Sequence, residues 1–212
     1  MFLPIIVIVI AVILLVAAFL LVRMMLFTQR TSNVYLEHDS NLPKLSVDPL
    51  DVARNLSSVI KIETVSHEDV ELDIKANFKV LQTKLAKQYP LTHSILKKEI
   101  LDGYSLLYTW KGSDAALDPI VFMAHQDVVP ADEFTLDQWT HAPFSGEIAD
   151  GFIWGRGTMD IKNQLIAVFE AVEQLIRNNY QPARTIMLSF SHNEEVLGSG
   201  AVAVVAHLKL CQ

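Results

Sequence analysis

Three groups of metal-ligand side chains recur at equal intervals along the chain, and this spacing constrains the fold more than any other feature. Asp160 lies 35 residues after His125, and Glu195 lies a further 35 residues on, with Asp127 and Glu194 beside the outer two. Each group follows an apolar run that is typical of a strand. The spacing suits strand and helix units that deliver side chains to one edge of an α/β sheet. The sequence therefore predicts a metal site there, because zinc accepts imidazole and carboxylate ligands.

The N-terminal stretch predicts a membrane anchor. Residues 2–22 contain no charged side chain, and as a helix they would reach about 31 Å, enough to cross a hydrocarbon core of about 30 Å. A cleaved signal peptide, the alternative, predicts a basic start, a shorter apolar stretch and a small-residue cleavage site. The start here is uncharged, and Arg23-Met24-Met25 follows where that site would lie. We therefore expect an uncleaved single-pass anchor over residues 1–27.

Charge and cysteine content limit the partners and the compartment only partly. Arg23 and Arg30 follow the apolar stretch, so the positive-inside rule weakly favours a cytoplasmic position for the rest of the chain. The single cysteine, Cys211, excludes an internal disulfide and does not identify the compartment. A net charge of −7 without a basic stripe argues against a nucleic-acid partner.

The rest of the chain predicts helices that alternate with strands. After a polar tether at 28–47, acidic capping and apolar periodicity indicate helices at 48–60, 69–87, 161–178 and 201–210. Strands are expected at 94–100, 104–110, 119–124 and 184–190, with an Asp102-Gly103 hairpin turn between the first two. The apolar run 119–124 predicts a strand buried on both faces. The glycine-rich segment 132–157 predicts a turn-rich excursion with one short strand at 152–154. We expect an α/β fold with a mostly parallel central sheet flanked by helices.

Each candidate ligand also has an ordinary structural interpretation. His125 and Asp127 lean to the same side of an extended segment, so Asp127 can accept the second ring proton of a metal-binding imidazole, but the pair also suits a surface loop. Asp160 precedes a helix, where aspartate is a common N-cap. Glu194 and Glu195 repel each other when confined, so one is suited to a metal and the other to proton transfer, unless both lie on a solvated loop.

Taken together, the motifs resemble the family of dinuclear zinc exopeptidases and amidohydrolases that includes aminoacylases and glutamate carboxypeptidases. Membrane-tethered carboxypeptidases of the carboxypeptidase S type and N-acyl amino acid hydrolases look most similar. The resemblance extends over about residues 50–210 and rests on the segments 104–110, 123–130, 139–146, 150–157, 160–162 and 191–195.

The resemblance implies a role for each candidate residue. His125 would bind one zinc ion, Glu195 a second, and Asp160 both, with Co²⁺ or Mn²⁺ as alternatives. Glu194 would be the general base that takes a proton from water, and Asp127 would support His125. The implied reaction is hydrolysis of an amide bond in a peptide or N-acyl amino acid, with the catalytic part on the extracytoplasmic side. The family also has a non-proline cis peptide after Asp160.

The same resemblance implies two further ligands, an acidic residue and a histidine, beyond the glutamate pair. This chain ends 17 residues after Glu195, so residues 48–212 are expected to be the N-terminal part of a catalytic domain. The lid, the dimerisation domain and the C-terminal part would be absent, and a homodimer is expected only of a full-length form. His141, His192 and His207 are candidate substitutes, but we expect His141 and His207 to be surface residues. The alternative is a catalytically inactive, membrane-anchored remnant or binding module.

Overall fold

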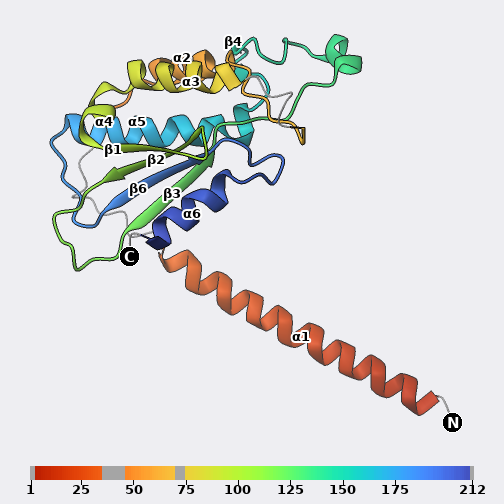
Figure 1. Ribbon diagram of the computed structural model, residues 1–212. Coiled ribbons are helices and arrows are strands. Elements are labelled where there is room, and N and C mark those ends of the chain that lie inside the picture. Colours follow the sequence, from red (N-terminus) through yellow and green to blue (C-terminus); the bar gives the residue numbers. More distant parts are fainter. Residues whose placement is uncertain (1–2, 35–45, 70–74, 211–212) are drawn as a thin grey trace. The chain divides into compact units, whose positions relative to one another are not determined.

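The structure is a computed structural model that describes residues 3–34, 46–69 and 75–210. The chain divides into two compact units, Met1–Lys44 and Leu45–Gln212. In the first unit, helix α1 spans Leu3–Val34 (Figure 1). Its segment Ile6–Leu26 is long and apolar enough to cross a membrane, a test that an N-terminal signal sequence also passes.

Helix α1 continues past residue 27, where the anchor was expected to end. No proline or glycine interrupts the sequence between Pro4 and Pro43, so residues 28–34 of the expected tether extend the helix. Residues 35–45 of that tether lie outside the described residues.

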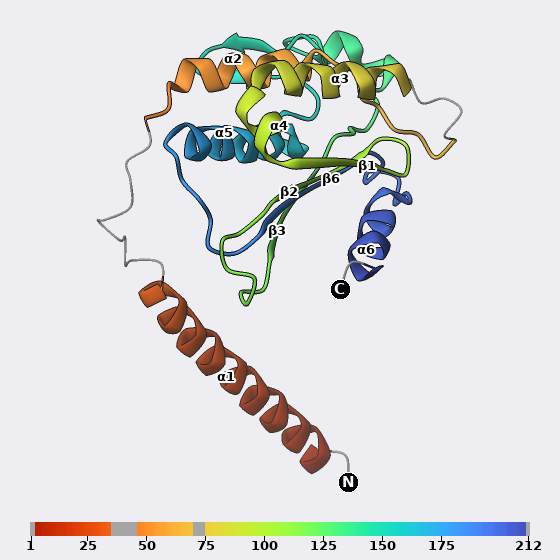
Figure 2. The same cartoon turned by 60° about the vertical axis from the view of Figure 1, so that its left-hand side comes forward.

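The second unit is a four-stranded sheet with helices on both faces. Figures 1 and 2 show the helices α2 to α5 on one face, with α2 and α3 outermost, and α6 on the other face. The helices are α2 (Pro49–Ile60), α3 (Lys75–Gln88), α4 (Pro90–Ile95), α5 (Asn163–Arg177) and α6 (Gly200–Leu210). The strands of the sheet are β1 (Lys97–Leu101), β2 (Ser105–Trp110), β3 (Ile120–His125) and β6 (Ile186–Ser191).

The sheet has the order β1-β2-β6-β3, and its pairing is mixed. The strands β3 and β6 are parallel, whereas β1–β2 and β2–β6 are antiparallel. The α/β class is confirmed, but the expected mostly parallel arrangement applies only to β3–β6 among the described pairs. The hairpin explains the difference at β1–β2, because Asp102 and Gly103 both have positive φ and reverse the chain within a tight turn.

Strand β3 corrects the prediction of burial on both faces. It lies at an edge of the sheet, and its first four residues are exposed, with 46% for Phe122 and 55% for Met123. A continuous apolar run indicates that a strand is suited to burial, and neighbouring elements decide whether it is covered. Within the described residues, no strand pairs with the second edge of β3. Only Ala124 and His125, at its C-terminal end, are buried.

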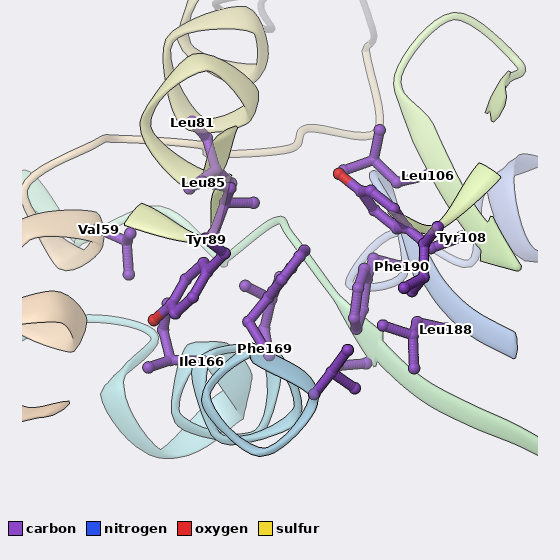
Figure 3. Close-up of a cluster of buried hydrophobic side chains, with 14 of the residues drawn as sticks. Val59, Leu81, Leu85, Tyr89, Leu106, Tyr108, Ile166, Phe169, Leu188 and Phe190 are labelled. Carbon is purple, nitrogen blue, oxygen red and sulfur yellow. The ribbon is translucent and has the colours of Figure 1, made fainter. Parts of the chain in front are cut away.

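The hydrophobic core lies between the sheet and helix α5 and fixes the strands that carry the site. Phe169 of α5 stacks on Tyr89 and Phe190 with ring centroids 5.0 and 5.3 Å away, and meets the edge of Tyr108 at 5.4 Å (Figure 3). Such aromatic contacts add to the stability given by apolar burial. Leu165 of α5 is also fully buried in this core.

Two predicted boundaries differ from the structure. Pro90 occupies the first turn of the short helix α4, so residues 94 and 95 are helical and β1 begins only at Lys97. The expected helix 69–87 corresponds to α3, but its predicted start at 70–74 lies outside the described residues.

The excursion between β3 and α5 contains more structure than expected. It holds a short 3-10 helix η2 (Glu133–Gln138) and a hairpin of β4 (Glu147–Ala149) with β5 (Phe152–Trp154). The sequence predicted only β5. A short kinked turn, η3 (Thr158–Lys162), then leads into α5.

Candidate metal centre

The parallel pair β3 and β6 brings two of the predicted ligand groups to one edge of the sheet. His125, the last residue of β3, is in register with Ser191, the last residue of β6. Glu194 and Glu195 lie in the turn that follows β6, and Asp160 is supplied by η3. One ligand atom from each of His125, Asp160 and Glu195 lies within 4.8 Å of the others. The strand topology therefore converts a sequence spacing into a compact group of ligand atoms.

The separation of the ligand atoms suits a zinc ion. His125 Nε2 lies 3.1 Å from Asp160 Oδ1. Two ligands that each lie 2.0–2.1 Å from zinc at a tetrahedral angle are roughly 3.3 Å apart. The nitrogen and oxygen donor set is also one that zinc accepts. The residues present thus fit a metal ion in both distance and chemistry.

Asp160 faces the site and does not cap the following helix. The N-cap of α5 is Lys162, which makes no side-chain capping bond. Asp160 has non-helical backbone angles and a side chain that is 71% exposed, with Oδ1 directed at His125. The peptide bond between Asp160 and Ile161 is cis, as the resemblance implied. The helix-cap interpretation of Asp160 therefore does not describe this structure.

Asp127 lies behind His125 and is completely buried. His125 Nδ1 is 3.0 Å from the main-chain oxygen of Asp127 and 3.3 Å from its Oδ1, so the main chain is the nearer acceptor. Either oxygen can hold a proton on Nδ1, which leaves Nε2 as the ligand atom. The same carboxylate accepts hydrogen bonds from the main-chain N–H groups of Glu194 and Glu195, at 3.1 and 3.0 Å. Asp127 therefore joins the β3 end to the glutamate turn.

The negative charges of the carboxylates at the site repel one another, and this repulsion favours a bound cation. Burial disfavours a charged imidazole, but the hydrogen bond and negative charge of Asp127 outweigh it and raise the pKa of His125 to about 9. Burial also opposes the charge of Asp127, yet hydrogen bonds from His125 and Ser66 lower the pKa of that carboxyl. Burial, followed by the charge of Asp160, raises the pKa of Glu195. A cation between these carboxylates would relieve the repulsion.

Sequence reasoning missed Lys162 as a buried structural group. Its side chain is completely buried, and Nζ donates hydrogen bonds to the main-chain oxygens of Ile62 at 2.8 Å and Val59 at 3.2 Å. Burial lowers its pKa to about 7. These contacts tie η3, and with it Asp160, to the end of α2. No local pattern reveals such a role, because the partners lie about a hundred positions away in the sequence.

Asn193, directly before the glutamate pair, holds the turn in which the pair lies. Its Oδ1 accepts a hydrogen bond from the main-chain N–H of Gly200 at 2.9 Å, at the start of α6. The amide therefore links the glutamate turn to the helix that follows.

The three histidines considered as substitute ligands lie outside the described ligand group. His141 is within 2.8 Å of Glu147 and only 15% exposed, which corrects its expected surface position, since the β4–β5 hairpin covers it. His192 Nδ1 lies 2.8 Å from Ser105 Oγ. His207 is 30% exposed and lies 3.4 Å from Glu99.

Comparison with known proteins agrees with this geometry. Residues 121–211, which contain all five predicted site residues, match the model of Peptidase family M20/M25/M40. This segment is similar to peptidase family M20/M25/M40. The matched segment begins within β3 and includes the glutamate turn, so the candidate centre lies inside it.

Curated relatives extend the similarity to most of the chain. A probable carboxypeptidase S-like protein from Dictyostelium discoideum is 39% identical over 82% of this chain and 34% of its own length. Carboxypeptidase S from Saccharomyces cerevisiae is 40% identical over 81% of this chain and 30% of its own length. An N-fatty-acyl-amino acid synthase/hydrolase from Bos taurus is 40% identical over 73% of this chain and 30% of its own length. The chain thus spans about a third of the length of these M20 relatives.

Solved structures support the fold. Human carnosine dipeptidase 1 matches with a TM-score of 0.53 and 22% identity, over 72% of this chain and 33% of that chain. An M20 family metallo-carboxypeptidase from Sulfolobus solfataricus gives the same TM-score and identity, over 68% of this chain and 30% of that chain. At this identity, the likeness concerns the fold alone.

Proposed function

We propose that this chain forms part of a zinc-dependent hydrolase that cleaves the amide bond of a peptide or an N-acyl amino acid. The observation that carries the proposal is the convergence of ligand atoms from His125, Asp160 and Glu195 within 4.8 Å, in a segment that matches an M20 peptidase family. Relatives named as a carboxypeptidase and as an N-fatty-acyl-amino acid synthase/hydrolase support this substrate class.

His125 would hold one ion and Glu195 a second, and Asp160 would contribute to the binding of both. Bound zinc ions lower the pKa of water and polarise a carbonyl group. The donor set would also accept Co²⁺ or Mn²⁺. Asp127 would fix the tautomer of His125 by accepting a hydrogen bond from Nδ1, which would leave Nε2 free to bind an ion.

Glu194 is suited to move the proton in this reaction. Its side chain is 54% exposed, and Oε2 lies 3.6 Å from His125 Nε2. It can therefore reach both the candidate metal centre and a substrate that approaches from solvent. We assign Glu194 the role of general base, which takes a proton from the attacking water and passes it to the leaving amine.

Helix α1 would attach this catalytic part to a membrane. An apolar segment of 21 residues, Ile6–Leu26, has the length of a single span. We propose an anchor over residues 1–27, a tether at 28–47 and an extracytoplasmic catalytic part at 48–212. The uncharged start and the absence of small residues at positions 23–27 support an anchor over a cleaved signal sequence.

Hydrolysis by the full chain in detergent with added zinc tests the proposal. The substrates are a blocked dipeptide and an N-fatty-acyl amino acid. Glu194→Gln should lower the rate by about a hundredfold or more, because general base catalysis contributes that much, while zinc binding is retained. Glu133→Gln, in η2 and outside the ligand group, is the matched control and should keep the wild-type rate.

Equal hydrolysis by Glu194→Gln and wild type would contradict the assigned role. Zinc binding without any hydrolysis by the wild-type chain would favour the alternative, a catalytically inactive membrane-anchored binding module.

A further inference from the structure

The carboxylate of Asp127 is a junction between three separate segments of the chain. Its Oδ1 accepts a hydrogen bond from the main-chain N–H of Glu194, and its Oδ2 accepts one from the main-chain N–H of Glu195. The hydroxyl of Ser66, from the segment between α2 and α3, donates a third hydrogen bond to Oδ2 at 2.6 Å. Asp127 and Ser66 are both buried, with 0% and 1% exposure. A short bond from a hydroxyl to a buried carboxylate is among the stronger hydrogen bonds in proteins.

Ser66 is itself held on a rigid support. Its main-chain N–H donates to the oxygen of Val128 at 3.2 Å, and the Val128 N–H donates to the oxygen of Thr64 at 3.0 Å. Val65 and Val128 form a parallel β-bridge, which aligns the two extended segments. The Thr64 hydroxyl adds a bond to the main-chain oxygen of Gln126 at 2.6 Å. The Ser66 hydroxyl therefore approaches Asp127 from a fixed direction.

We propose that Ser66 is a positioning residue that sets, through Asp127, where the Glu194–Glu195 turn lies relative to His125. This inference rests on the proposed function for its catalytic meaning, and the contacts themselves do not depend on a metal. Without the hydroxyl, Oδ2 keeps only the Glu195 N–H, and the carboxylate can rotate away from the turn. Metal ligands need to be placed to within about 0.5 Å, so this freedom of the turn that carries Glu195 would weaken metal binding.

Two readouts on the full chain in detergent test the inference. Without metal, Ser66→Ala should speed amide hydrogen exchange at Glu194 and Glu195 relative to Leu188 in the core of β6. With Zn²⁺ as the probe, its affinity should fall about tenfold or more, as is common when a group behind a metal ligand is removed. Ser66→Thr, which keeps the hydroxyl, should restore both.

Ser57→Ala provides the matched control. Ser57 is also a buried serine, but its hydroxyl donates to the main-chain oxygen of Gly146 outside the ligand group. In Ser57→Ala, the rate of amide hydrogen exchange at Glu194 and Glu195 and the affinity for zinc should equal those of wild type. The inference is overturned if Ser66→Ala behaves like this control, or if Ser66→Thr is as impaired as Ser66→Ala. If the wild type binds no zinc but Ser66→Ala still speeds exchange at these two amides, the positioning role stands and the proposed function fails.

Discussion

At the scale of single residues, the candidate centre depends on buried polar groups that are not themselves candidate metal ligands. Asp127 holds His125 and the glutamate turn, and Lys162 holds the segment that supplies Asp160. Buried polar groups are stable only when their hydrogen bonds are satisfied, so these groups also fix the backbone around the site. The exposed site residues Asp160 and Glu194 are thus attached to a rigid base.

Lys162 gives the stability of the chain a specific pH dependence. In the folded chain the pKa of Lys162 is about 7, whereas its ordinary value is 10.5. Between pH 7 and pH 10.5 the unfolded chain therefore binds more protons than the folded chain. The free energy of unfolding contributed by Lys162 therefore rises with pH across this window and is lost as pH falls towards 7. Urea unfolding of the full chain in detergent, at about pH 7 and about pH 10, should show a smaller rise with pH for Lys162→Met.

The exposed neighbour Lys61 supplies the control, because Lys61→Met should keep the wild-type dependence. His125, whose pKa is raised to about 9, contributes the opposite slope, but equally in all three proteins. Identical pH slopes for Lys162→Met and wild type would show that Lys162 is not neutral in the folded chain.

Sequence reasoning identified the residues of the candidate site by their spacing but not the groups behind them. His125, Asp160 and Glu195 follow a pattern that a sheet edge brings together. Ser66 and Lys162 occupy no such pattern, since their partners lie 61 and about 100 positions away. Only the packing of α2 and its following segment against the sheet places them at the site.

At the scale of elements, glycine contacts fix the excursion between β3 and α5 to helix α2. Gly146 has φ +56°, and a methyl group there would collide with the main-chain oxygen of Ser57. The Ser57 hydroxyl also donates to the main-chain oxygen of Gly146 at 2.5 Å. The β4–β5 hairpin is therefore held against α2 by a close backbone contact.

Gly146→Ala should lower the free energy of unfolding by more than Gly151→Ala does. Both positions have positive φ, but a methyl group at Gly151 meets no atom within 4 Å. Strain from the backbone is common to both, so the collision at Gly146 should cost about 1–3 kcal/mol more. Urea unfolding of the two variants in parallel measures this difference. Equal losses would mean that the excursion moves freely relative to α2.

Helix α4 depends on a carboxylate from another element. Glu173 of α5 accepts hydrogen bonds from the main-chain N–H groups of Leu91 and Thr92 through different oxygens, at 3.0 and 2.8 Å. In Glu173→Gln, an amide N–H₂ group must face one of these donors, which should cost about 1–3 kcal/mol of stability. Glu170→Gln should cost less, because its bonds from Asn55 and Tyr89 use a single oxygen that the amide retains. If thermal unfolding shows that Glu170→Gln is less stable than Glu173→Gln, this account is contradicted.

At the scale of the whole molecule, the sequence predicted the α/β class and the main helices and strands, but not the environment of every element. The parallel pair β3–β6 was implied by the ligand spacing, and the antiparallel pairs follow from the hairpin. Exposure of β3 could not be predicted, because composition indicates what a strand tolerates and neighbouring elements decide what covers it. The candidate ligands His125 and Glu195 nevertheless lie at and after the C-terminal ends of the parallel strands, as expected.

The most direct test of the central claim is calorimetric titration of the full chain in detergent with Zn²⁺, beside Glu195→Ala and the control Glu133→Gln. The account predicts saturable zinc binding to wild type and to the control, with two ions per chain. Glu195→Ala should bind at least about tenfold more weakly, since a ligand that contacts the metal matters at least as much as a group behind it. Absence of binding to wild type, or equal affinity of wild type and Glu195→Ala, would contradict the claim that these residues form a metal centre.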